Sequence, residues 1–127
     1  MMGWIDDLAD HVETALPSLS PIYLETLDMA APDCVIMISS PGTGISYKSG
    51  IKTLHKGDVG FRVRNRDLET AKQQAELISS YFELKTSFWA GTTWFKRIIN
   101  ENGFYHVSTD RVNGSIYSVN CYIEYEE

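Results

Sequence analysis

The chain has 127 residues, of which 43% are hydrophobic and 22% are charged, and its formal net charge at pH 7 is −6. This size and composition are typical of one ordered globular domain spanning residues 1–127, and they argue against disorder. No apolar run approaches the roughly 20 residues that cross a bilayer, and the start of the chain lacks a secretory-signal pattern, so we expect a cytoplasmic origin without a membrane segment.

The first part of the chain predicts one helix and two strands. Apolar residues recur at helical spacing from Trp4 to Leu16, and acidic residues in the first turn favour a helix that ends at Pro17. Residues 22–24 suggest a short strand. Residues 34–38 are apolar on both faces, which is typical of a strand inside a sheet.

The middle of the chain predicts a loop, a strand and a second helix. Residues 41–57 contain four glycines and show no strong periodicity, so we expect a long loop of the kind that often carries function. Residues 59–64 then alternate between apolar side chains and Gly60, Arg62 and Arg64, which is typical of a strand with one buried face. Asp67 is placed to cap a helix with an apolar stripe from residue 68 to residue 82.

The last third predicts antiparallel strands at residues 93–99, 104–107 and 117–125, with turns at Asn102–Gly103 and Asn113–Gly114. Together these elements predict an α+β fold, with an antiparallel β-sheet of about four to five strands and two α-helices packed on one face. Cys34 and Cys121 fall in apolar strand-like segments, so we expect buried free thiols.

Motifs of catalysis or ligand binding are incomplete. Gly42-Thr43-Gly44 lacks the remainder of a phosphate-binding loop, and residues 44–48 lack the last glycine of a nucleophile elbow. The three histidines have no partners at metal-ligand spacing. The aromatic residues 88–95 could stack on a ligand, but in strands they more often belong to the core. We therefore expect no catalytic residue, no metal and no cofactor.

Charge is divided sharply along the chain. The first 47 residues contain seven acids and no Lys or Arg, whereas basic residues crowd the segment from residue 48 to residue 66. The acids of the first helix read individually as its solvated face, but such a division also allows the basic segment of one copy to meet the acidic segment of another. Contacts between two different patches build rings or filaments. The candidate interface residues are Lys48, Lys52, Lys56, Arg62, Arg64, Arg66, Asp67, Asp6, Asp7 and Asp10.

The order of these segments resembles the phage minor capsid, tail-terminator and tail-completion proteins of the head-tail junction. The similar parts are the first helix, residues 32–36, a glycine-containing loop, residues 59–64, the passage from Asn65 to Ile78, and residues 110–114 followed by 120–123. The resemblance implies a virion protein that forms a homo-hexameric ring, contacts the major tail tube protein and the head connector, and lets DNA pass without specific binding. It implies no catalysis and no cofactor, and the loop at residues 41–57 matches the loop that could mediate ring contacts.

Three other functions remain open from the sequence. A small-molecule enzyme of unknown type has only the loop and the aromatic residues to support it. A head-completion or connector adaptor would need the same kind of small subunit. A small nucleic-acid-binding module would use Arg62, Arg64 and Arg66, and its binding would fall steeply with salt.

Overall fold

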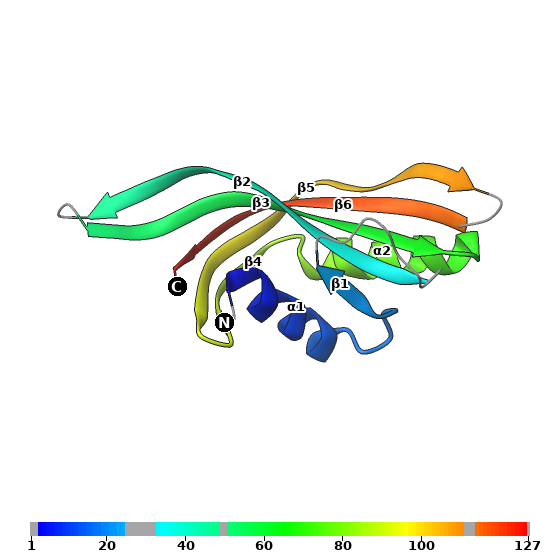
Figure 1. The fold of residues 1–127 in the computed structure, drawn as a ribbon, viewed down its shortest axis with the longest axis horizontal. Coiled ribbons are helices and arrows are strands. Elements are labelled where there is room, and N and C mark those ends of the chain that lie inside the picture. Colours follow the sequence, from blue (N-terminus) through cyan, green and yellow to red (C-terminus); the bar gives the residue numbers. More distant parts are fainter. Residues whose placement is uncertain (1–2, 25–32, 49–50, 111–113, 127) are drawn as a thin grey trace.

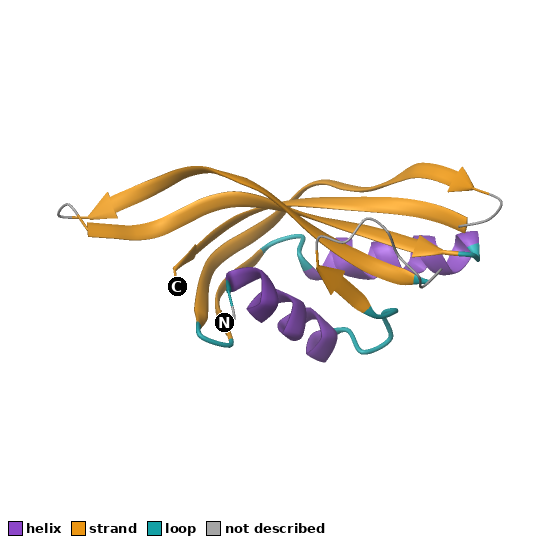
Figure 2. Ribbon diagram, viewed as in Figure 1, coloured by secondary structure: helices purple, strands orange, loops and turns teal. Residues whose placement is uncertain are grey.

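The computed structural model describes residues 3–24, 33–48, 51–110 and 114–126, and within them it contains two helices and one six-stranded sheet. The elements are α1 (Trp4–Ala15), β1 (Ile22–Leu24), β2 (Cys34–Lys48), β3 (Ile51–Asn65), α2 (Leu68–Tyr81), β4 (Lys85–Ala90), β5 (Thr93–Asp110) and β6 (Gly114–Glu126). The strands lie in the order β1-β2-β3-β6-β5-β4. Figures 1 and 2 show both helices on the same side of the twisted sheet.

The α+β class and the placement of the helices on one face are as predicted, but the sheet is larger than predicted and is mixed. β1 runs parallel to β2, with Ile22 opposite Val35, whereas every other neighbouring pair is antiparallel. A three-residue strand carries too short a pattern to reveal its direction from the sequence. The single parallel pair therefore escaped the prediction.

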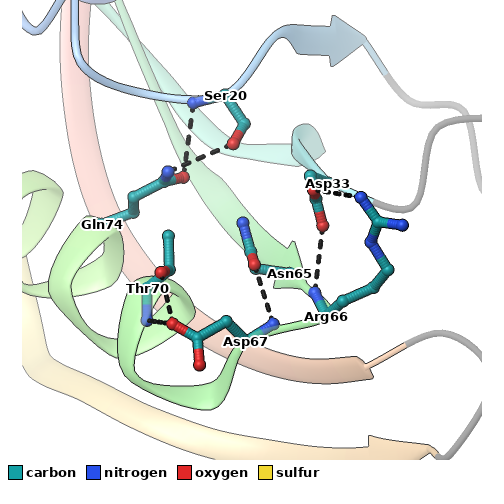
Figure 3. Close-up of polar contacts among 7 residues, drawn as sticks. All are labelled: Ser20, Asp33, Asn65, Arg66, Asp67, Thr70 and Gln74. Atoms are coloured by element: carbon teal, nitrogen blue, oxygen red, sulfur yellow. Dashed lines mark hydrogen bonds and ion pairs between the residues drawn. The ribbon is translucent and has the colours of Figure 1, made fainter.

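Both helices begin where the sequence places polar groups. The Asp67 carboxylate accepts hydrogen bonds from the backbone N–H and the hydroxyl of Thr70, at 3.2 and 2.6 Å, which confirms the predicted cap of α2 (Figure 3). At the start of α1, the N–H of Gly3 donates to the Asp6 carboxylate. α1 ends at Ala15, close to the predicted end.

The core lies between the helices and one face of the sheet. Val59, Phe61 and Val63 of β3 are at most 1% exposed, and the odd-numbered residues 117–125 of β6 face the same way, as their alternation predicted. The helices contribute Leu8, Ala9, Val12, Ala71, Ala75 and Ile78. Leu68 is the exception in the predicted stripe, because it is 46% exposed.

The described residues of the segment 41–57, which are 41–48 and 51–57, do not form the predicted loop, because they belong to the two strands of a long hairpin, and residues 49–50 lie outside the described part. β2 and β3 pair antiparallel as far as Lys48, which lies opposite Ile51, with register shifts after Ser40 and Ser46. These irregularities interrupt the alternation of side chains, so the segment shows no strand periodicity in its sequence. Figure 1 shows the far part of this hairpin extending past the rest of the fold. We call its described residues, 44–48 and 51–56, the arm.

One predicted turn is a bulge instead. β5 continues through Asn102–Gly103 as a single strand, and its register against β6 shifts at this point. Gly103 has φ +71°, so the Asn-Gly pair supplies the left-handed residue of a bulge rather than of a hairpin turn. The other predicted turn falls partly outside the described residues, because Asn113 is not described. Gly114, with φ +83°, begins β6, which pairs antiparallel with β5.

A buried carboxylate joins α1 to the turn between β4 and β5. Asp7 is 5% exposed and accepts hydrogen bonds from the hydroxyls of Thr93 and Thr92, at 2.7 and 3.3 Å. Gly91, the first central residue of this two-residue turn, has φ +57°. A Cβ atom at Gly91 would lie 2.3 Å from Oδ1 of Asp7. The turn therefore needs glycine both for its backbone conformation and for its approach to the helix.

We predict that Gly91→Ala destabilises the protein more than Gly103→Ala does. Both residues have positive φ, and an alanine in that region costs about 1–2 kcal/mol. A Cβ at Gly103 meets nothing within 4 Å, whereas at Gly91 it displaces the Asp7 carboxylate from its hydroxyl partners. Losing hydrogen bonds to a buried charge adds about 1.5 kcal/mol or more. Urea unfolding of the two variants measures the difference, and equal losses would contradict the role of Asp7.

Candidate functional site

Arg62 and Arg64 project from the face of β3 opposite the core, as the sequence predicted. Nη1 of Arg62 donates to Oγ of Ser118 on β6 at 2.6 Å. Arg64 lies opposite Cys34 of β2. Both arginines are only partly exposed. Their charges therefore lie along the surface of the sheet, in contact with neighbouring strands, and do not project freely into solvent.

Arg66 is engaged by an acid from the first part of the chain. Its Nη2 lies 3.2 Å from Oδ2 of Asp33, and its backbone N–H donates to Oδ1 of the same carboxylate at 3.0 Å (Figure 3). The backbone N–H first, and then the guanidinium, hold the pKa of Asp33 below its ordinary value. Part of the predicted charge division is thus satisfied within a single copy, which weakens that part of the argument for docking between copies.

The three acids of α1 do not form one surface. Asp10 is exposed, Asp6 is partly exposed at the first turn, and Asp7 is buried against the β4–β5 turn. Asp7 therefore does not belong to an exposed acidic surface, because its carboxylate binds Thr93 and is buried, and its predicted interface role stays a prediction. Asp67, another predicted interface residue, has a structural role in the fold, because its carboxylate caps α2.

The three predicted lysines all fall on the arm. Lys56 is partly exposed and lies opposite Glu124 of β6. Lys48 and Lys52 are placed by their backbones, opposite Ile51 and Tyr47, and their side chains lie outside the described part of the chain. The fold therefore gathers the lysines on one projecting element, away from Arg66.

The outer face of the sheet holds a polar hollow of about 440 Å³, lined by residues that include Asp58, Gly60, Arg62, Glu101 and Asn120. A Cβ at Gly60 would lie 3.1 Å from Oδ1 of Asn120, so the glycine leaves room for that amide. The lining carries charges of both signs. The hollow is therefore a mixed polar surface, without the concentration of positive charge that binds phosphate backbones.

A tyrosine hydroxyl lies beside this hollow. Nδ2 of Asn120 donates to the hydroxyl of Tyr105 at 2.8 Å. Hydrogen bonding by Ser118 and then by Asn120 lowers the pKa of Tyr105. This polar network links β5 and β6 across the outer face and orders the side chains along it.

The aromatic cluster at residues 88–95 is divided between the core and the surface. Phe95 is fully buried and stacks on Phe88 at a centroid distance of 5.1 Å, so the core interpretation holds for this pair. Trp89 lies opposite Trp94 in the β4–β5 pair and is 66% exposed. The core interpretation is therefore wrong for Trp89, although the alternation between Phe88 and Trp89 was a signal that they face opposite sides.

Two hollows flank Trp89. One, of about 330 Å³, is lined by Trp89, Thr92, Trp94 and Glu126, and the other, of about 250 Å³, includes Trp89, Asp10 and His11 in its lining. We call these two hollows and the indole between them the Trp89 surface. It combines exposed aromatic area with a carboxylate on each side. The sequence analysis considered ligand stacking by the aromatic residues that include Trp89 but favoured the core, and it gave Glu126 no role.

His11 ties α1 to α2 and β4 beside this surface. Its Nε2 lies 2.7 Å from the Tyr81 hydroxyl, and its ring packs 4.8 Å from that of Phe88. The Lys85 ammonium lies over the Tyr81 and Phe88 rings, at 4.7 and 5.2 Å from their centroids. Burial, and then the positive charge of Lys85, lowers the pKa of His11. At neutral pH the lowered pKa therefore favours the neutral imidazole.

Cys34 and Cys121 are buried free cysteines, as predicted. Burial raises the pKa of both thiols, that of Cys121 to about 12. Because the thiolate is the reactive form, neither is an activated nucleophile. Within the described residues, no three His, Cys, Asp or Glu side chains are grouped to hold a metal ion. Neither described helix is long and apolar enough to span a membrane.

No protein-family model matches this sequence, and no curated protein matches it.

We predict that His11 makes folding stability depend on pH. Its pKa in the folded state lies below the ordinary value of 6.5, so the unfolded chain binds a proton more readily. The contribution of His11 to folding stability is then fully present above pH 6.5, and it is lost as the pH falls from there toward the folded-state pKa. The matched control is His11→Gln, which does not titrate. The difference in unfolding free energy between the two proteins should shrink between pH 7.5 and about pH 5, and a constant difference would contradict this role.

Proposed function

We propose that the chain is a structural virion subunit of a tailed phage, a tail-terminator or tail-completion protein that assembles as a homo-hexameric ring at the head-tail junction. The observation that supports this best is the arm. A two-stranded hairpin is only marginally stable in water by itself. An element that projects from the fold in this way is best explained by a neighbour on which it packs.

The strand edges of the arm support the same conclusion. β6 joins β3 only from His55, opposite Tyr125, so among the described strands residues 51–54 pair with β2 alone. β1 pairs with β2 only at residues 35–37, so among the described strands none pairs with the other edge of β2 along the arm, at residues 44–48. Open edges are templates for pairing with another chain. The opposite end of the sheet, β4, presents a different edge.

Because the two exposed ends of the sheet are unlike, contacts between them would be heterologous. Contacts of that kind generate closed rings when the rotation between subunits closes. The arm also occupies the sequence position of the loop that the resemblance assigns to ring contacts. In this proposal the ring contacts the major tail tube protein and the head connector, and DNA passes through it without specific binding.

We predict that the protein is a stoichiometric component of tailed particles. Mass spectrometry of purified particles should detect it, and its gene should neighbour the portal and major tail protein genes. Loss of the gene should leave tails that do not join heads. A head-completion adaptor would instead leave heads without a completed connector, which electron microscopy distinguishes. Absence of the protein from particles would contradict the proposal.

We predict that the chain does not bind duplex DNA, even at about 50 mM salt, where phosphate contacts are strongest. Arg66 is paired with Asp33, Arg62 binds Ser118, and the hollow beside Arg62 contains two carboxylates. A gel-shift titration tests this. A shift that disappears as salt is raised, and that Arg62→Ala weakens, would favour the nucleic-acid-binding alternative.

A further inference from the structure

The Trp89 surface has the character of a protein-binding site. Trp89 is the most exposed large hydrophobic residue among those described, at 66%, and tryptophan is prominent among the residues that dominate binding energy at interfaces. Its cross-strand neighbour Trp94 widens the aromatic area. A single exposed hydrophobic side chain needs no explanation, but an exposed indole between two hollows is a shaped surface.

The chemistry of the hollows indicates a cationic ligand. Glu126 lies in one hollow and Asp10 in the other, and no Lys or Arg is among the described residues that line either of them. His11 is neutral at neutral pH because its pKa is lowered, and Lys85 lies over the Tyr81 and Phe88 rings outside both linings. An aromatic face beside a carboxylate suits a lysine side chain, whose stem packs on the ring while its ammonium meets the acid.

The arm carries the complementary charge. Residues 34–57 contain three lysines and no Asp or Glu, and all three lysines, Lys48, Lys52 and Lys56, fall on the arm. No residue of the described arm lines either hollow, so within the described part of the chain the arm does not cover the Trp89 surface of its own molecule. An arm that docks on this surface would then come from another molecule.

We infer that the Trp89 surface receives the lysine-bearing arm of a second copy of the chain. This contact joins two different patches, so each copy offers one arm and one Trp89 surface, and successive copies dock head to tail. The inference rests on the proposed ring assembly and assigns its contact. The acids of the first helix then have a smaller role in assembly than the sequence suggested, because Asp10 is the only one of them that is both exposed and at the docking surface.

The test separates the two halves of the contact in the full-length chain. Trp89→Ala removes the receiving surface and keeps the arm, whereas the double variant Lys48→Glu, Lys52→Glu removes the cationic arm and keeps the surface. Sedimentation velocity over a protein concentration series should show self-association of the wild type, weakening as salt is raised. Each variant alone should raise the dissociation constant about 30-fold or more. An equimolar mixture of Trp89→Ala and the double lysine variant should form a one-to-one complex and no larger oligomer, because it offers only one intact arm and one intact Trp89 surface.

Two further variants keep the test sound. Leu84→Ala is the matched control, because Leu84 is 65% exposed and lies outside both hollows, so its self-association should equal that of the wild type. If circular dichroism shows that Trp89→Ala is unfolded, Glu126→Lys takes its place in the test. This variant reverses a charge at the rim of the Trp89 surface and should weaken self-association. Failure of the mixture to form the complex, or a wild type that stays monomeric throughout, overturns the inference.

The outcomes are distinguishable from those of the proposed function. A wild type that assembles while the mixed variants stay monomeric leaves the ring intact and moves its contact elsewhere. A protein that docks through Trp89 but is absent from virions removes the phage assignment and keeps the docking surface.

Discussion

The register of β3 between its two neighbours is the constraint on which the rest of the structure depends. Val59, Phe61 and Val63 enter the core only because β3 pairs with β6 and β2 in one register. A slip of one residue would exchange them with Gly60, Arg62 and Arg64, which would bury two charges. β3 also continues out of the sheet into the arm, so the same register that fixes the core fixes the direction in which the arm leaves the molecule.

The second organising contact is the buried carboxylate of α1. Because Asp7 binds the hydroxyls of the β4–β5 turn, α1 is held close to the edge strand, and His11 is brought against Tyr81 and Phe88. Asp7 also lines the hollow between α1 and Trp89, so the carboxylate that holds the helix forms part of the wall of this hollow. The Asp7 carboxylate, which holds α1 in place inside the molecule, thus also shapes a surface that other molecules can reach.

The sequence predicted the elements whose pattern is periodic and local. The two helices were recognisable from their apolar spacing and from the cap at Asp67, and β6 from its alternation. The arm could not be recognised, because its bulges remove the alternation that marks a strand. Asn102–Gly103 forms a bulge in β5, although an Asn-Gly pair more commonly forms a turn. The pairing of Arg66 with Asp33 and the exposure of Trp89 depend on which segments meet in space, and one-dimensional charge patterns do not contain that information.

The two buried cysteines have a practical consequence. Both thiols resist ionisation, so mild alkylating reagents and oxidants have little thiolate to attack. A single cysteine introduced at the surface would then be the one readily labelled position in the chain. A dye or a crosslinker attached there would report on that position alone, without first removing the native cysteines from the core.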